Sequence, residues 1–209
     1  MALFLATMGV AGQYAKFVLG REKLLGFVQL FDLDKEITFP SLFQSSTLLL
    51  SSAMLAVIAL VRKRAGRGDA LQWGVLALIF LLMTLEEAAR IHYHVIEPLR
   101  RRAGVGGWLY TTWAVPATAA ALFFRRFLRD LPARVRVSYI LAAALLWGGA
   151  VGVEIVNLAY AQEHGGQNMT YALLTAVEEF MEMAGVIVFI DGTLRYMSTE
   201  MPELTVAVE

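Results

Sequence analysis

The stretch Thr170 to Met197, TYALLTAVEEFMEMAGVIVFIDGTLRYM, decides the fold of this protein. It is long and apolar enough to cross a bilayer, yet it carries Glu178, Glu179 and Glu182 near its middle. A carboxylate at mid-membrane costs at least ~2.5 kcal/mol, so three of them so close together need a physical reason. The stretch therefore predicts a membrane helix whose acidic residues face other helices and not lipid.

The composition points to the same class of protein. The chain has 209 residues, of which 58% are hydrophobic and 17% charged, and its net charge is zero. Its mean hydropathy of +0.59 is too high for a soluble domain of this length and indicates an integral membrane protein. The absence of cysteine excludes disulfides, thiolate metal sites and iron–sulfur clusters. Any metal ion would have to be held by Glu, Asp, His or water.

The apolar runs predict an all-α fold, a polytopic membrane helix bundle of about six transmembrane helices in a single membrane domain over residues 1–209. The expected spans are 3–19, 41–61, 71–92, 108–124, 137–161 and 170–192. One short helix at the membrane surface is expected over about residues 21–31, where apolar residues recur at helical spacing. The acidic sequence FDLDKE that ends it is interpreted as a solvated turn.

Basic residues set the expected orientation. Half of the 18 lie in the loops between spans two and three and between spans four and five: Arg62, Lys63, Arg64, Arg67, Arg125, Arg126, Arg129, Arg134 and Arg136. The opposite side has fewer basic residues, with one cluster at Arg100, Arg101 and Arg102. Because basic loops stay in the cytoplasm, both termini are expected to be cytoplasmic.

Two other expected spans carry acids at matching depth. Glu86 and Glu87 lie about 22 Å along the third span and Glu154 at a similar height in the fifth, at 1.5 Å per residue. Glu178 lies about 10 Å from the outer end of the last span. We therefore expect the acids of three helices to meet at one level, in the outer half of the bilayer.

Helical spacing assigns a face to each of these helices. In the last span, one polar stripe comprises Tyr171, Thr175, Glu178, Glu182 and Gly185, with Glu179 beside it. In the fifth span, the corresponding face comprises Trp147, Ala150, Glu154, Asn157 and Ala161. The small residues Gly148, Gly149, Ala150 and Gly152 permit another helix to approach this span closely.

Arg90 is the one clear intramembrane base opposite six acids. Carboxylates that repel each other in a low dielectric are stabilised by protonation, by pairing with Arg90 or histidine, or by a bound cation. The first hypothesis is therefore a buried metal site with Arg90 as counter-charge. Its candidate ligands are Glu87, His94, Glu154, Glu178 and Glu182, with Glu86 and Glu179 as further ligands or support.

Oxygen and imidazole ligands suit the transition metals iron, manganese and zinc. Such a site would make the protein a redox enzyme or a hydrolase that acts on a lipid-soluble or membrane-proximal substrate, and the sequence leaves open whether it is an enzyme at all. The Glu-x-x-His pairs of di-metal bundles are absent, so a di-iron site would be irregular. Haem is not expected, because only His92 and His94 lie near a span and both are on one helix.

Two further hypotheses stay open. The acids could instead relay protons or cations in a transporter, although no inverted repeat is evident and the acids do not form a ladder across the bilayer. Alternatively, they form structural ion pairs in an accessory or assembly subunit of a larger membrane complex. Apart from the lipid bilayer, the expected partners are other membrane subunits. Nucleic acid is not expected, because the topology explains the basic clusters.

Three short motifs carry a resemblance to other proteins: FDLDKEITFP before a span, LEEAARIH in the third span and VEEFMEMAGVIVFI in the last. In this pattern the chain resembles a diffuse group of uncharacterised bacterial multi-pass inner-membrane proteins. The resemblance implies a location in the bacterial inner (plasma) membrane. It implies no mechanism, since the group has no established activity.

Overall fold

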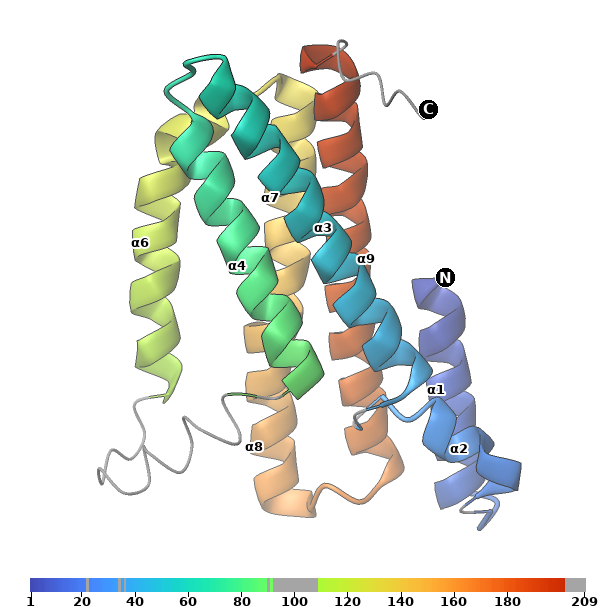
Figure 1. Cartoon of the computed structure of the whole chain (residues 1–209). Coiled ribbons are helices and arrows are strands. Elements are labelled where there is room, and N and C mark those ends of the chain that lie inside the picture. Colours follow the sequence, from blue (N-terminus) through green and yellow to red (C-terminus); the bar gives the residue numbers. More distant parts are fainter. Residues whose placement is uncertain (22, 34, 36, 90, 92–108, 202–209) are drawn as a thin grey trace, which may run out of the picture. The chain divides into compact units, whose positions relative to one another are not determined.

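The computed structural model describes residues 1–21, 23–33, 35, 37–89, 91 and 109–201, with the backbone alone for residues 109–118. The described chain is all-helical, as the sequence predicts. Its longer helices are α1 (Ala2–Phe17), α3 (Phe39–Arg64), α4 (Ala70–Ala89), α6 (Leu109–Asp130), α7 (Ala133–Trp147), α8 (Glu154–His164) and α9 (Met169–Glu200). A π-helical turn, η3 (Gly148–Val153), joins α7 to α8, so that the three elements form one continuous helix (Figure 1).

Helices occupy each of the six ranges expected to span a membrane. Three of the described helices are long and apolar enough to do so: Phe39–Arg64, Ala70–Ala89 and the continuous helix Ala133–His164. The glutamates of α9 give it more charge than an ordinary span. The structure therefore supports a membrane protein with three helices of spanning character in its described part.

The expected surface helix over residues 21–31 is shorter than predicted. The structure has a 3₁₀ turn, η1 (Leu24–Gly26), followed by one helical turn, α2 (Phe27–Leu30). Leu25 and Gly26 have φ angles of 55° and 88°, which belong to the left-handed region and interrupt a regular helix. The periodic apolar pattern did not reveal this break.

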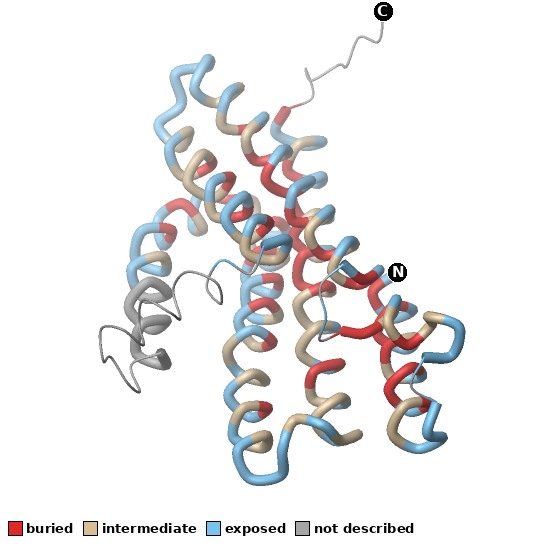
Figure 2. The backbone as a smooth tube through the Cα atoms, turned by 60° about the horizontal axis from the view of Figure 1, so that its bottom comes forward, coloured by how far each residue is buried: buried red, intermediate tan, exposed pale blue. Residues whose placement is uncertain are grey.

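Contacts divide the chain into two compact units. The first comprises Met1–Thr47 and Val137–Gly192. Its core joins the N-terminal helix to α9: Leu5 and Leu33 form one buried cluster with Met183. Burial recurs along the helices, where buried positions alternate with exposed ones (Figure 2).

The interpretation of FDLDKE as a solvated turn is wrong for its first acid. Asp32 is only 3% exposed and Gln13 only 8%. The Gln13 side-chain amide donates a hydrogen bond to Asp32 Oδ1 at 3.0 Å, and Lys35 Nζ lies 3.4 Å from Asp32 Oδ2. Asp32 is thus buried with polar partners, one of which α1 supplies from a distant part of the sequence. Asp34 and Glu36 lie outside the described residues.

The second unit comprises Leu48–Arg136 and Thr193–Glu209. Leu55, Ile58 and Trp73 are completely buried in it. The Ser52 hydroxyl donates to the carbonyl oxygen of Ala77 at 2.8 Å and ties α3 to α4. Trp73 thus packs in the interior of this unit.

Candidate carboxylate site

Within the first unit, the helix formed by α7, η3 and α8 packs antiparallel to α9 (Figure 1). A Cβ atom placed on Gly185 would lie 3.1 Å from the carbonyl oxygen of Ala142. One placed on Gly149 would lie 2.9 Å from the carbonyl oxygen of Glu178 and 3.1 Å from Cγ of Glu182. The close approach predicted from the small residues is thus confirmed at Gly149, where the absence of a side chain lets the two backbones meet.

This pairing brings acids of two helices to one level. One contact joins Gly149 to Glu178 and Glu182, and a hydrogen bond joins Asn157 to Thr175. Glu154 lies between the two contact positions on its helix, while on α9 Glu178 belongs to the first contact and lies three residues from Thr175 in the second. Because the helices are antiparallel, Glu154 and Glu178 are level within about one helical turn of 5.4 Å. Both side chains are half-buried.

The π-helical turn η3 directly precedes Glu154. The Glu154 amide donates to the carbonyl oxygen of Gly149, five residues earlier, which is the hydrogen bond of a π-helix. The extra residue in this turn rotates the side chains that precede it about the helix axis, relative to their directions in a regular α-helix. Trp147 and Ala150 are therefore exposed, although helical spacing placed them on the buried face with Asn157, which is buried. Predicting that face with one uninterrupted period was wrong for its first half.

Asn157 and Thr175 make a buried polar link beside the two acids. Asn157 is 2% exposed and Thr175 is 7% exposed. Thr175 donates its hydroxyl proton to the carbonyl oxygen of Tyr171 at 3.2 Å, so it accepts from Asn157 Nδ2 at 3.0 Å. This arrangement leaves Asn157 Oδ1 shielded from water and without a hydrogen-bond donor among the described residues. The site thus contains one unused oxygen acceptor three residues from Glu154.

The stripe predicted on α9 is turned inward. Thr175 and Gly185 are buried, while Tyr171, Glu178 and Glu182 are half-buried. Glu179, beside the stripe, is half-buried as well. None of the three α9 glutamates is without a partner.

The remaining predicted residues are divided between the second unit and the part of the chain that is not described. Glu86 and Glu87 lie near the end of α4 in the second unit and are half-buried. Arg90 and His94 lie outside the described residues, as does His92. Within the described ranges, no group of three or more His, Asp or Glu side chains is placed to hold a metal ion.

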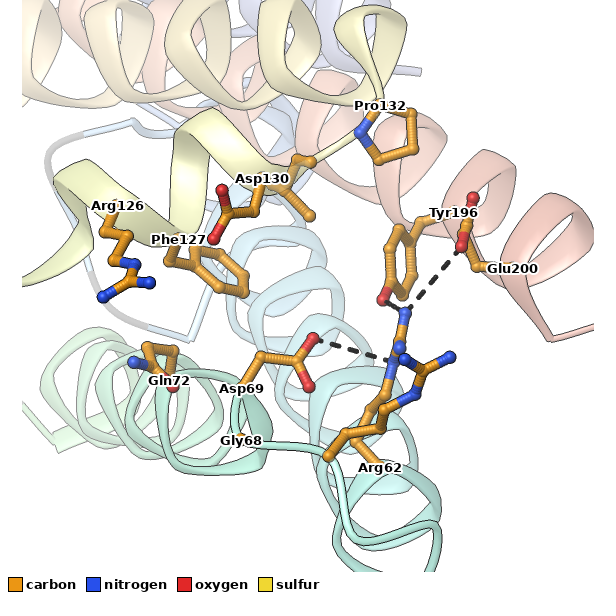
Figure 3. Close-up of a pocket in the computed structure, with 12 residues that line it drawn as sticks. Arg62, Gly68, Asp69, Gln72, Arg126, Phe127, Asp130, Pro132, Tyr196 and Glu200 are labelled. Atoms are coloured by element: carbon orange, nitrogen blue, oxygen red, sulfur yellow. Dashed lines mark hydrogen bonds and ion pairs between the residues drawn. The ribbon is translucent and has the colours of Figure 1, made fainter.

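A polar cluster in the second unit, which we call the Arg62 cluster, was not predicted from the sequence. Arg62 at the end of α3 donates to the Tyr196 hydroxyl, and its Nε lies 3.7 Å from Asp69 Oδ2. Its Nη2 lies 3.9 Å from Glu200 Oε2 (Figure 3). Asp69 also accepts from the Trp73 ring nitrogen at 3.2 Å.

The side chains of the Arg62 cluster interact in a mostly buried environment. Only 14% of the Arg62 side chain is exposed. Burial raises the pKa of the Tyr196 hydroxyl, and the Arg62 guanidinium opposes this effect in part. In the sequence, Arg62 is one of many loop arginines that set topology. The available signal was Asp69 four residues before Trp73, a spacing that puts Asp69, directly before α4, on the same side of the helix as Trp73.

The fold and the site define an all-helical protein with membrane-spanning character and half-buried carboxylates. Comparison with protein families makes the assignment more specific. The chain belongs to the family described as "Domain of unknown function (DUF8692)", whose model matches residues 1–196. Neither a curated protein nor a solved structure matches the chain.

Proposed function

We propose that this protein is an integral membrane helix bundle that binds a transition-metal ion at carboxylates on α8 and α9. Asn157 Oδ1 is the observation that carries the proposal. A buried acceptor without a donor costs about 1–3 kcal/mol, and a cation beside it removes that cost. Glu154, at the level of Glu178, supplies negative charge three residues from this oxygen.

The full ligand set includes residues beyond this pair. The described His, Asp and Glu side chains alone do not make a three-ligand group. In the proposed site, Glu182 and the amide oxygen of Asn157 join Glu154 and Glu178, and Glu179 serves as a further ligand or supporting acid. The sequence alone proposes His94, Glu86 and Glu87 as additional ligands and Arg90 as counter-charge. Iron, manganese and zinc accept carboxylate oxygens and imidazole as ligands.

The proposed setting is the bacterial inner membrane, with about six spans and both termini in the cytoplasm. Basic residues concentrated at one end of the spans support this orientation. A bound metal ion polarises a substrate oxygen or lowers the pKa of bound water. The proposed activity is accordingly a redox or hydrolytic reaction on a lipid-soluble or membrane-proximal substrate.

Elemental analysis tests the proposal. The protein, purified in detergent without a metal-affinity tag, should contain near-stoichiometric iron, manganese or zinc by inductively coupled plasma mass spectrometry. Glu178→Gln and Asn157→Leu should each lower the metal content. Glu163→Gln is the matched control, because Glu163 lies on α8 with 79% of its side chain exposed. A metal content that is negligible in the wild type, or equal in all four proteins, contradicts the proposed metal site.

A structural role for the acids is the second candidate. None of the six glutamates is without a partner, and the described residues contain no three-ligand group. Both observations favour ion pairs and hydrogen bonds that hold helices together in an accessory subunit of a membrane complex. In that case Glu178→Gln lowers the free energy of unfolding while the protein contains no metal, and the protein copurifies with other membrane subunits.

A further inference from the structure

A pocket of about 700 Å³ lies in the second unit, beside the Arg62 cluster (Figure 3). Its lining includes Gly68, in the turn between α3 and α4, and Pro132, directly before α7. Three of the helices able to cross a membrane therefore have an end here: Phe39–Arg64 ends, while Ala70–Ala89 and Ala133–His164 begin. A pocket at the ends of membrane-spanning helices lies at the depth of the lipid headgroups.

The charges that line this pocket are balanced. The lining contains three arginines and three carboxylates: Arg62, Arg67, Arg126, Asp69, Asp130 and Glu200. Arg62 contacts Tyr196, Asp69 and Glu200, and its Nε has no hydrogen-bond partner among the described residues. Arg67 and Arg126 are exposed, and Figure 3 shows Arg126 on the side of the pocket away from Arg62. Two exposed guanidinium groups suit a phosphate. The three carboxylates of the lining repel a ligand that carries negative charge alone.

Two acceptors of the lining need a donor. Asp69 Oδ1 and Gln72 Oε1 are shielded from water and have no hydrogen-bond partner among the described residues. The other oxygen of Asp69 already accepts from Trp73. A ligand N–H group that reached either oxygen would remove the cost of an unsatisfied buried acceptor. The carboxylate of Asp130, which is exposed, adds negative charge for a cationic donor.

We propose that this pocket binds the headgroup of a phospholipid that carries both a phosphate and a primary ammonium group, as phosphatidylethanolamine does. Arg67 and Arg126 bind the phosphate. Asp69 and Gln72 accept hydrogen bonds from the ammonium, and Asp130 contributes charge. The site rests on the membrane setting of the chain, and it is independent of the metal site in the first unit.

Lipid selectivity tests the proposed ligand chemistry. Delipidated protein in detergent is titrated with phosphatidylethanolamine, phosphatidylcholine or phosphatidylglycerol, and bound lipid is counted by native mass spectrometry. The quaternary ammonium of phosphatidylcholine has no N–H group, and phosphatidylglycerol has no ammonium. Phosphatidylethanolamine should therefore bind at least about threefold more tightly than either, the ratio expected for one hydrogen bond. Equal or tighter binding of phosphatidylglycerol overturns the proposal.

Variants locate the bound lipid. Arg126→Gln should weaken binding of phosphatidylethanolamine several-fold, and Gln72→Leu should reduce its preference over phosphatidylglycerol. Arg129→Gln is the matched control, because Arg129 is exposed on the same helix and does not line the pocket. Weakening by all three variants to the same degree, or by none, contradicts a site in this pocket.

The source of the headgroup is tested by competition. Soluble phosphoethanolamine carries the same two groups without acyl chains. It should displace the lipid only at concentrations far above those at which the lipid binds, because acyl chains in the detergent micelle add to the affinity. Displacement at equal concentration would show that the pocket takes a soluble ligand and would overturn the lipid assignment. Metal content, measured in the same samples, separates a failure of this proposal from a failure of the metal site.

Discussion

Replacing Gly149 by alanine should loosen the contact between η3 and α9 that aligns Glu154 with Glu178. The new Cβ would lie 2.9 Å from the carbonyl oxygen of Glu178, 3.1 Å from Cγ of Glu182 and 3.3 Å from Cβ of Met181. The first distance is shorter than real Cβ contacts allow, and the atom it meets is backbone, which cannot rotate away. One of the two helices must therefore move.

The size of the effect follows from two opposing contributions. Alanine in place of glycine favours a helix by about 1 kcal/mol. Forcing a methyl group into a closed contact costs about 1–3 kcal/mol. Gly152→Ala is the matched control, because Gly152 lies in the same π-helical turn and a Cβ there meets nothing within 4 Å. The helix-propensity contribution cancels between the two variants, so Gly149→Ala should be about 1–3 kcal/mol less stable than Gly152→Ala.

Equilibrium unfolding measures this difference. The three proteins are unfolded in mixed micelles of a mild detergent and increasing sodium dodecyl sulfate, and the loss of helix is followed by far-UV circular dichroism. Gly152→Ala should be as stable as the wild type or more stable, and Gly149→Ala less stable than Gly152→Ala. If both variants are stabilised equally, the helices do not meet at Gly149 and the alignment of Glu154 with Glu178 is wrong.

Two further predictions concern the second unit and the buried aromatic residues. Trp73→Ala should lower the free energy of unfolding by about 3–5 kcal/mol, because Trp73 is completely buried between Phe127 and Tyr196. Trp147→Ala, at a position that is 41% exposed, should cost much less in the same unfolding assay, and equal losses would contradict the burial of Trp73. Burial raises the pKa of Tyr196, so the hydroxyl contributes stability below the ordinary tyrosine pKa of about 10, and this stability is lost as pH rises through the higher pKa of the folded state. The stability of Tyr196→Phe should consequently fall less steeply than that of the wild type above about pH 10, and parallel curves would refute the raised pKa.

One feature of the candidate site was predictable from the sequence: the depth of each acid along its helix. Counting residues from the helix ends placed Glu154 and Glu178 at one level, and the antiparallel contacts agree. Counting could not reveal that Asn157 Oδ1 is left without a donor, because this depends on the direction in which the Thr175 hydroxyl donates. Hydrogen-bond direction is a property of the neighbours that tertiary packing supplies.

The Arg62 cluster was missed for a related reason. A basic turn between two spans is ordinary in a membrane protein, and its charges explain topology without any specific partner. Tyr196 lies 134 residues away from Arg62 in sequence. The same holds for Asp32, which accepts its hydrogen bond from Gln13 on α1 and is therefore buried in a stretch that resembles a polar turn in sequence. Partners at such separations leave no local pattern.

By itself, the sequence determined the all-helical fold, the positions of the longer helices and the presence of acids inside apolar segments, because hydrophobic length and helical period are local properties. Tertiary structure decided the rest. The π-helical turn after Trp147 changed which face of the fifth predicted span is buried, and close contact at Gly149 set the register against α9. The physical reason is that packing between helices depends on the shapes of both partners, whereas a sequence pattern describes one helix at a time.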